Sequence, residues 1–307
     1  MLSRGCGIVL YYGFMRESGK FLQATLLPAA LISIDLVMLG VLLALGWVEY
    51  DAAGNIIDSK PWGLLLAGVL LATLELAAYR FLVKTFAARE VTELAPKFAW
   101  CEVGVGAVLG ALCVSLPILW QWAMGIRTLN TAGVASGIGL GIAIGLLTSV
   151  FEELFFRGVM FRLLYETRGA VWAFVLTTIT FGVMHLPNPG MTLVEAAILG
   201  LEGGILFGAA YLWRRRLWLP IGLHFGWNTA LGSLLGTNVS DMGEHSGPLN
   251  GAFSGSAWLT GASADLKGSL LSLAVTLGLA TILMRTRTRP APATSAASPG
   301  SADDTVR

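Results

Sequence analysis

Residues 150–158 read VFEELFFRG, and they place two adjacent glutamates and an arginine within an otherwise apolar segment. Charged side chains are costly in the hydrocarbon core of a bilayer, and they persist where they pair, face a cavity or take part in chemistry. On a helix Glu153 and Arg157 stand one turn apart and can form an ion pair, whereas Glu152 points about 100° away from that pair. Glu152 is therefore the free acid of the segment and the candidate general base. An ion pair that only locks two helices together is the alternative interpretation.

The composition predicts an integral membrane protein. The chain has 307 residues, of which 55% are hydrophobic and 13% are charged, and its mean hydropathy is +0.71. Ordinary globular domains carry about 25% charged residues. The formal net charge of +1 provides no field that would attract nucleic acid, so we expect no nucleic-acid partner. Three cysteines, an odd number, imply no disulfide framework.

Apolar segments recur along the chain at lengths near the roughly 20 residues that a helix needs to cross a bilayer. They cover residues 21–48, 62–83, 98–122, 133–162, 170–186, 192–213, 217–235 and 268–284. The predicted fold class is all-α: a polytopic membrane protein that forms a bundle of about eight transmembrane helices. Lys and Arg gather in every second connection, so the positive-inside rule predicts a multi-pass protein of the cytoplasmic membrane with both termini in the cytoplasm.

Two further polar positions lie within these apolar segments. The fifth segment ends with FGVMHLP at residues 181–187, where Pro187 closes the helix and leaves His185 in its last turn. In the seventh segment His224 and Asn228 are four residues apart, so they project from one helical face. A lone histidine on an apolar helix usually only packs, but here two of the chain's three histidines lie in predicted spans. The third, His245, has no neighbour at metal-ligand spacing and is expected to be a solvated loop residue.

The expected depths of these residues can be compared from the helical rise of about 1.5 Å per residue. Glu152, His224 and Asn228 come out at about 12 to 18 Å from the inner ends of their helices, near the middle of a core about 30 Å thick. His185 comes out roughly 5 to 10 Å nearer the outer side, a difference that a tilted or late-starting helix would remove.

Together these residues resemble the three signature motifs of the CPBP family, the type II CAAX prenyl endopeptidases and their bacterial relatives. The motifs are Glu152 and Glu153 with Arg157, then Phe181 with His185, then His224 with Asn228. The resemblance covers roughly residues 133–235. It implies an intramembrane, glutamic-type endopeptidase with a conical, water-accessible cavity.

The resemblance also implies a role for each residue. Glu152 and His185 would activate the hydrolytic water, His224 and Asn228 would donate hydrogen bonds to the oxyanion, and Glu153 with Arg157 would orient the site. The chemistry agrees, because peptide hydrolysis needs a base for water and donors placed where negative charge develops. No cofactor is expected. The alternative is a zinc protease with Glu152, His185 and His224 as ligands, which we rank second because there is no H-E-x-x-H pair and Asn is a poor zinc ligand.

The predicted spans and the resemblance together divide the chain into six segments. The predicted parts are a cytoplasmic N-terminal segment (1–20), N-terminal transmembrane helices (21–132), the CPBP-like catalytic core (133–235), an external loop (236–267), the last transmembrane helix (268–284) and a disordered cytoplasmic tail (285–307). The expected partners are the membrane and a membrane-associated protein or peptide substrate, with or without a lipid group.

The sequence alone does not decide the roles of three other acids or exclude two other classes of function. Asp35, Glu75 and Glu202 fall within predicted spans without a motif, and structural pairing or cavity lining is favoured over catalysis for each. Glu202 is the best of them for lining the cavity, because its helix lies between two motif helices. A transporter would also place charges at mid-membrane, and a non-catalytic membrane scaffold is the third possibility.

Overall fold

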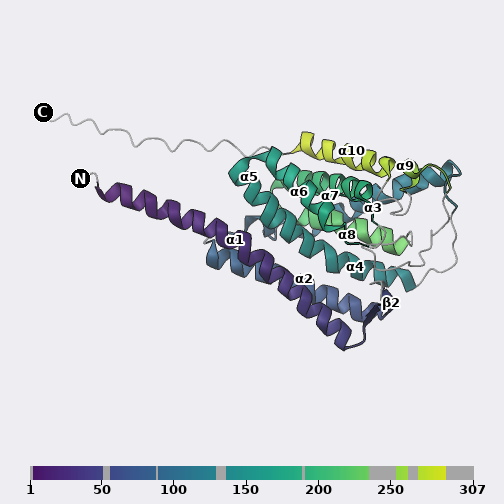
Figure 1. Cartoon of the computed structure of the whole chain (residues 1–307), viewed down its shortest axis with the longest axis horizontal. Coiled ribbons are helices and arrows are strands. Elements are labelled where there is room, and N and C mark those ends of the chain that lie inside the picture. The colour runs from purple at the N-terminus through teal and green to yellow at the C-terminus, as the bar shows by residue number, and fades with distance from the viewer. Residues whose placement is uncertain are drawn as a thin grey trace.

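A computed structural model shows the chain as a bundle of helices with one small hairpin of strands (Figure 1). It describes residues 3–50, 56–87, 89–128, 136–188, 191–234, 254–261 and 269–287.

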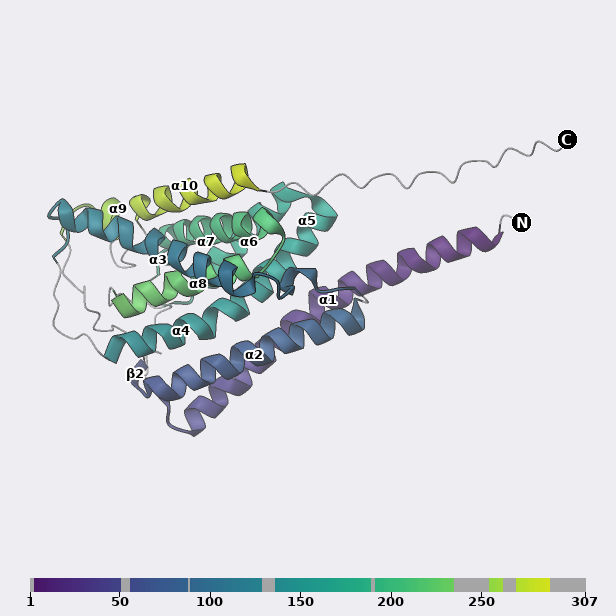
Figure 2. The same cartoon turned by 180° about the vertical axis from the view of Figure 1, so that it is seen from behind.

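The first two long helices form an antiparallel pair along one edge of the bundle (Figures 1 and 2). They are α1 (Ser3–Ala44) and α2 (Pro61–Phe86). The strands β1 (Val48–Tyr50) and β2 (Ile56–Ser59), which pair antiparallel, lie between them in the chain. The N-terminal end of α1 projects beyond the other helices in both views.

The expected first span, residues 21–48, agrees at its start with the candidate span Gly19–Ala44 but ends too late. The helix already includes residues 3–20, which the sequence analysis set apart as an N-terminal segment. No proline interrupts that stretch, so the helix continues through it. The helix stops at Ala44 because Gly46 adopts a positive φ of 59°, and Val48 already belongs to a strand. The hairpin of strands was not expected.

The fourth expected span is one continuous helical run that changes its winding beside the glutamates. It consists of α4 (Ser136–Glu153), the π-helix η2 (Leu154–Phe161) and α5 (Arg162–Arg168). The π-helix begins directly after Glu153, and the run continues beyond the expected end at residue 162. A π-helical turn leaves backbone carbonyls shifted from the α-helical pattern, and such turns are frequent at functional sites.

The remaining helices surround this run. They are η1 (Thr92–Leu94, a 3₁₀ turn), α3 (Ala99–Ala123), α6 (Ala170–Met184), α7 (Leu193–Arg214), α8 (Trp218–Thr229) with the π-helix η3 (Ala230–Leu234), α9 (Ala257–Thr260) and α10 (Leu270–Thr286). Helix α8 packs against α3 and α4, α7 packs against α6 and α10, and α2 packs against α1 and α4. Helix α8 therefore runs through the interior, and nine of its twelve residues are buried.

Small residues let α3 and α8 approach until their backbones meet. A Cβ atom added to Gly110 of α3 would lie 2.0 Å from the carbonyl oxygen of Leu223, and one added to Gly226 of α8 would lie 2.0 Å from that of Ala107. Helices in membranes associate by such close packing. These two glycines therefore set how closely α8 lies against α3.

The protein is a helical membrane protein, as predicted, but the number of spans is not confirmed as eight. Four helices in the described part of the chain are long and apolar enough to cross a bilayer, within residues 19–44, 62–86, 99–123 and 193–214. Two further apolar helices, α6 and α10, are shorter.

Part of the expected external loop is a packed segment. Within residues 236–267 the structure describes Ser254 to Gly261, which include α9. The amide of Ser254 donates to the carbonyl of Ile126, and Gln121 at the end of α3 donates to the carbonyl of Leu259. His245 lies outside the described residues, as do residues 288–307 of the expected tail.

Candidate active site

The predicted polar residues of α4 and α8 meet in the interior of the bundle. Glu152 and Glu153 are the last two residues of α4, and His224 approaches them from α8. The Nδ1 atom of His224 lies 2.9 Å from Oε1 of Glu153, and its Nε2 atom lies 3.8 Å from Oε2 of Glu152. The histidine ring therefore stands between the two glutamates, although 71 residues separate it from Glu153 in the chain.

Glu153 and Arg157 form the expected ion pair, and both side chains are fully buried. Arg157 donates from Nη1 to Glu153 at 3.0 Å and from Nη2 to the carbonyl of Gly203 in α7 at 2.6 Å. Its guanidinium also lies 5.0 to 5.5 Å from the ring centres of Phe156, Phe181 and Phe207. Such rings attract a cation, most strongly where water is excluded. The pair is thus fixed to α7 and enclosed by aromatic rings.

The contact with Glu153 restricts what His224 can do. A carboxylate only accepts hydrogen bonds, so Nδ1 of His224 carries the proton in this contact. In the neutral ring Nε2 then keeps its lone pair and faces Glu152. In the imidazolium Nε2 also carries a proton and can donate to an oxyanion. Glu153 thus orients the ring both as a base and as a hydrogen-bond donor. In hydrolases with a histidine base, a carboxylate bonded to Nδ1 holds the ring in the same way.

His185, His224 and Asn228 line one cavity of about 30 Å³ in the bundle interior. His185 caps α6, and its Nδ1 lies 2.7 Å from the carbonyl of Phe181, so Nδ1 donates and Nε2 is left as an acceptor. Asn228 donates from Nδ2 to the hydroxyl of Thr148 at 2.8 Å. The structure therefore brings the histidine of α6 to the same cavity as the pair on α8, and the depth difference expected for His185 does not keep them apart.

Glu152 does not line that cavity and instead borders a second, larger cavity of about 290 Å³. The walls of this second cavity come from α1, β1, α2 and α4 and are mostly apolar, with Asp35 of α1 as the other acid in its lining. The side chain of Glu152 is 15% exposed, whereas that of Glu153 is fully buried. The acid that was expected to be free is thus the one that can be reached from a cavity.

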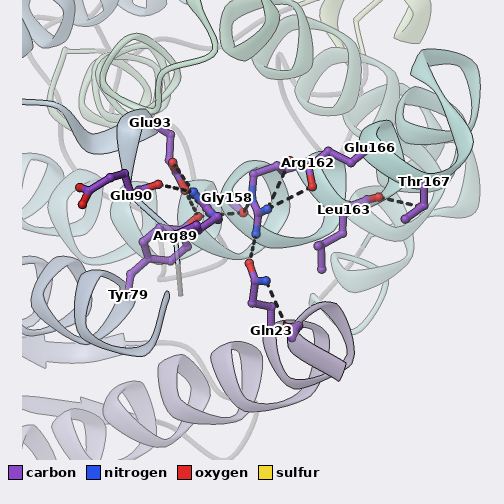
Figure 3. A network of polar contacts seen from close by, with 11 residues as sticks. Gln23, Tyr79, Arg89, Glu90, Glu93, Gly158, Arg162, Leu163, Glu166 and Thr167 are labelled. Carbon is purple, nitrogen blue, oxygen red and sulfur yellow. Dashed lines mark hydrogen bonds and ion pairs between the residues drawn. The ribbon is translucent and has the colours of Figure 1, made fainter. Parts of the chain in front are cut away.

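A network of polar contacts supports the π-helix that follows the glutamates (Figure 3). The carbonyl of Gly158 lies 2.9 Å from the hydroxyl of Tyr79 and accepts from Nε of Arg162 at 2.8 Å. The same hydroxyl lies 2.7 Å from Oε1 of Glu93. A Cβ atom on residue 158 would lie 2.9 Å from the Tyr79 ring, so the approach of α2 requires a glycine there. These contacts connect the π-helix η2 to α2 and to η1.

Charged side chains complete this network beyond the π-helix. Arg162 donates from Nη2 to the amide oxygen of Gln23 in α1 and lies 3.3 Å from Glu166. Burial opposes ionisation of Glu93, but the hydrogen bonds and charge of Arg89, at 2.5 Å, outweigh it and hold the pKa of Glu93 below its ordinary value. The N-terminal helices and the run that carries the glutamates are thus joined by buried polar contacts.

Among the residues that the structure describes, no three His, Cys, Asp or Glu side chains are grouped to hold a metal ion. The zinc alternative, with Glu152, His185 and His224 as ligands, stays a prediction that a chelation experiment tests. Nδ1 of each histidine is also engaged, by Phe181 and by Glu153 respectively.

Several contacts of the site were not foreseen in the sequence. Thr148 holds Asn228, and it could have been noticed because it lies one turn before Glu152 on the same helical face. The carbonyl of Gly203 and the hydroxyl of Tyr79 gave no sequence signal. Of the other acids, Glu202 lines the cavity of the two histidines, as expected. Asp35 borders the cavity at Glu152 and interacts with Glu75.

A comparison with known proteins finds a family model that resembles the part of the chain that contains this site. Residues 134–230 match the model described as type II CAAX prenyl endopeptidase Rce1-like. The resemblance inferred from the three motifs is thereby confirmed. The matched segment contains α4, the π-helix η2, α5, α6, α7 and α8, so all six predicted site residues lie within it.

One curated relative agrees with this family. The chain is 26% identical over 141 residues to the protein named "Putative membrane peptidase YdiL" of Bacillus subtilis (strain 168). The alignment covers 38% of this chain and 55% of the relative, so it spans about half of the relative's length. No solved structure matches this chain.

Proposed function

We propose that the protein is an intramembrane endopeptidase that hydrolyses a peptide bond of a membrane-associated protein or peptide. The observation that carries the proposal is the position of His224 between a buried, arginine-paired Glu153 and a cavity-facing Glu152. The Rce1-like match of residues 134–230 supports the same reaction class. Proton relays of transporters also combine Glu and His, but a transporter would show ion-dependent flux and no peptide cleavage.

The proposed reaction begins with Glu152 as the general base. Its carboxylate removes one proton from a water molecule while Nε2 of His185 accepts a hydrogen bond from the same water. The water oxygen then attacks the carbonyl carbon of the substrate, and negative charge develops on the carbonyl oxygen. When the tetrahedral intermediate collapses, the C–N bond breaks and Glu152 returns its proton to the leaving amine. The products are a carboxylic acid and an amine, and Glu152 is again ionised.

Stabilisation of the oxyanion is assigned to α8. His224, as an imidazolium, donates from Nε2, and the Nδ2 hydrogen of Asn228 that does not bind Thr148 provides the second donor. Donors fixed in advance in a site of low dielectric are worth far more than the same donors in water, and loss of one typically reduces the rate by about 10²- to 10³-fold. Glu153 and Arg157 act on the reaction through His224, as positioning residues.

The larger cavity suggests how a substrate reaches Glu152. It holds about 290 Å³ and its lining is mostly apolar, which suits an apolar segment or a lipid group of the substrate. A lipidated CAAX-type protein and an unlipidated membrane peptide would both satisfy this chemistry. The cleavage test therefore includes both kinds of peptide.

The proposal is tested with purified protein in proteoliposomes and two internally quenched peptides of one sequence, one prenylated at a C-terminal CAAX cysteine and one unmodified. The wild type is expected to cleave at least one peptide. Glu152→Ala, His185→Ala and His224→Ala should each lower the rate by at least about 10²-fold while the protein stays folded. Equal rates for the wild type and Glu152→Ala would refute the role of this residue. The same assay in the presence of a strong chelator distinguishes the metal-free reaction, which survives, from the zinc alternative, which is lost and restored by Zn²⁺.

A further inference from the structure

Glu202 is a buried acid of α7 that the proposed reaction does not use. Its residue is 1% exposed, and neither carboxylate oxygen has a hydrogen-bond partner among the described residues. The hydroxyl of Ser272 in α10 is close enough to act on the carboxyl but does not meet it in hydrogen-bond geometry. A buried polar group that lacks a partner costs about 1 to 3 kcal/mol, and more when it is charged. The fold therefore retains a costly group at this position.

The carboxyl of Glu202 faces the cavity of about 30 Å³ that His185, His224 and Asn228 also line. Its neighbour Gly203 accepts the hydrogen bond from Arg157, so this part of α7 is fixed to the ion pair of the site. The rest of the lining is apolar or aromatic. Four polar side chains from three helices thus line one small cavity.

Size and chemistry of the cavity both fit water. A cavity needs roughly 10 to 15 Å³ of this volume and two to four polar partners for each water, so about two molecules fit here. The Nε2 atom of His185 is free to accept, because Nδ1 binds the carbonyl of Phe181. The carboxyl group of Glu202 supplies an acceptor, and Asn228 supplies a donor. Each hydrolysis consumes one water, and the apolar interior of a membrane supplies none.

We propose that Glu202 anchors an internal water site beside the oxyanion donors, from which the hydrolytic water reaches His185 and Glu152. The catalytic meaning of the site rests on the proposed function, whereas the binding of water by Glu202 does not. Its ligand is water alone, and the carboxyl of Glu202 is the residue that holds it against the apolar walls.

X-ray hydroxyl-radical footprinting with mass spectrometry tests the water site directly, because bound water labels the side chains that it touches. Trp227 lines the cavity and is only 5% exposed, so its modification reports internal water. Labelling of Trp227 should fall at least about 5-fold in Glu202→Met, whose unbranched side chain has a similar length but no acceptor of comparable strength. Glu202→Gln keeps a polar head and should retain most of the labelling. Glu202→Leu serves as the second apolar variant should the methionine variant fail to fold.

Glu75→Met is the matched control, because Glu75 is also a fully buried acid of a helix but does not line this cavity. It should leave Trp227 labelling at the wild-type level. Glu202→Met should also lower kcat at least about 10-fold, because the hydrolytic water loses the group that holds it. Unchanged Trp227 labelling in the apolar variants would overturn the inference. If labelling falls as expected but the wild type cleaves no peptide, the water site stands and the proposed function fails.

Discussion

Arg157 shows how one residue can be both costly and indispensable in a membrane protein. Its guanidinium is fully buried, and its charge is balanced by Glu153 and by three aromatic rings. A buried ion pair gains little over a well-packed apolar pair, but removal of one partner leaves an uncompensated charge. The pair is therefore better explained by the orientation of His224 than by stability.

Substitutions of the pair separate these two effects. Arg157→Met is expected to destabilise the protein by about 3 to 5 kcal/mol, because Glu153 stays buried without its cation. The double variant Glu153→Met/Arg157→Met should recover most of that loss, yet it should remain inactive because His224 is no longer oriented. Reversible unfolding in mixed micelles measures the stability and peptide cleavage measures the activity. A double variant less stable than Arg157→Met would contradict this account.

Glu93 predicts how stability depends on pH. Its pKa lies below the ordinary value of 4.5 in the folded protein, because its contacts with Arg89 outweigh burial. A lowered folded pKa stabilises the fold above the unfolded pKa, and this contribution is lost as the pH falls through the folded value. The Tm difference between the wild type and Glu93→Gln should therefore be constant near neutral pH and shrink below about pH 4.5. A difference that stays the same down to pH 3 would show that the Glu93 carboxylate does not stabilise the fold.

At the residue scale, the sequence allowed only local relations to be predicted. The Glu153–Arg157 pair follows from a spacing of four residues on one helix. The partners of Arg157 and Asn228 on other helices, Gly203 and Thr148, do not follow, because their contacts depend on how each helix is rotated against its neighbours.

At the scale of elements, the π-helix is the feature that the sequence did not reveal. Residues 154–161 read as ordinary helix, and no proline or glycine pair marks the change of winding. Contacts with other helices stabilise the π-helix η2. The main one is the contact between the hydroxyl of Tyr79 and the carbonyl of Gly158. A local sequence pattern cannot show donors that come from distant parts of the chain. The sequence therefore predicted a helix here correctly, but not its π-helical winding or its length.

Packing of α3 against α8 gives a paired test with two glycines of one helix. Gly110→Ala would place a Cβ atom 2.0 Å from the carbonyl oxygen of Leu223, whereas Gly104 has no atom within 4 Å of that position. Gly110→Ala should destabilise the protein by about 1 to 3 kcal/mol or more, because the backbones must move apart. Gly104→Ala should be neutral or stabilise by up to about 1 kcal/mol through helix propensity. Equal thermal stability of the two variants would contradict the direct contact of α3 with α8.

At the scale of the whole molecule, a membrane bundle followed from composition and from the recurrence of apolar segments. The eight expected spans correspond to helices, but only four of the described helices meet the length and hydropathy of a span. Helices α6 and α10 are apolar but shorter than a span, and the hairpin shows that apolar patterns do not fix what lies between spans. The resemblance to the Rce1-like family could be predicted because the three motifs can be read directly from the sequence, and residues 134–230 match its model.

The distribution of Lys and Arg predicts the orientation of the bundle. Both termini should lie in the cytoplasm, because basic residues gather in every second connection. Fusions of green fluorescent protein and of alkaline phosphatase at each end, in a bacterial host, measure this. Fluorescence without phosphatase activity is expected at both ends. Phosphatase activity at either end would contradict the orientation.

The most direct test of the account is peptide cleavage in H₂¹⁸O, followed by mass spectrometry of the new carboxyl group. Wild-type protein in proteoliposomes should release a fragment with one ¹⁸O atom from the internally quenched peptide that it cleaves. Glu152→Gln should release this fragment at least about 10²-fold more slowly, with folding and insertion unchanged, because its amide cannot take a proton from water. Equal rates of ¹⁸O incorporation by the wild type and by Glu152→Gln would contradict the central claim that Glu152 activates the hydrolytic water.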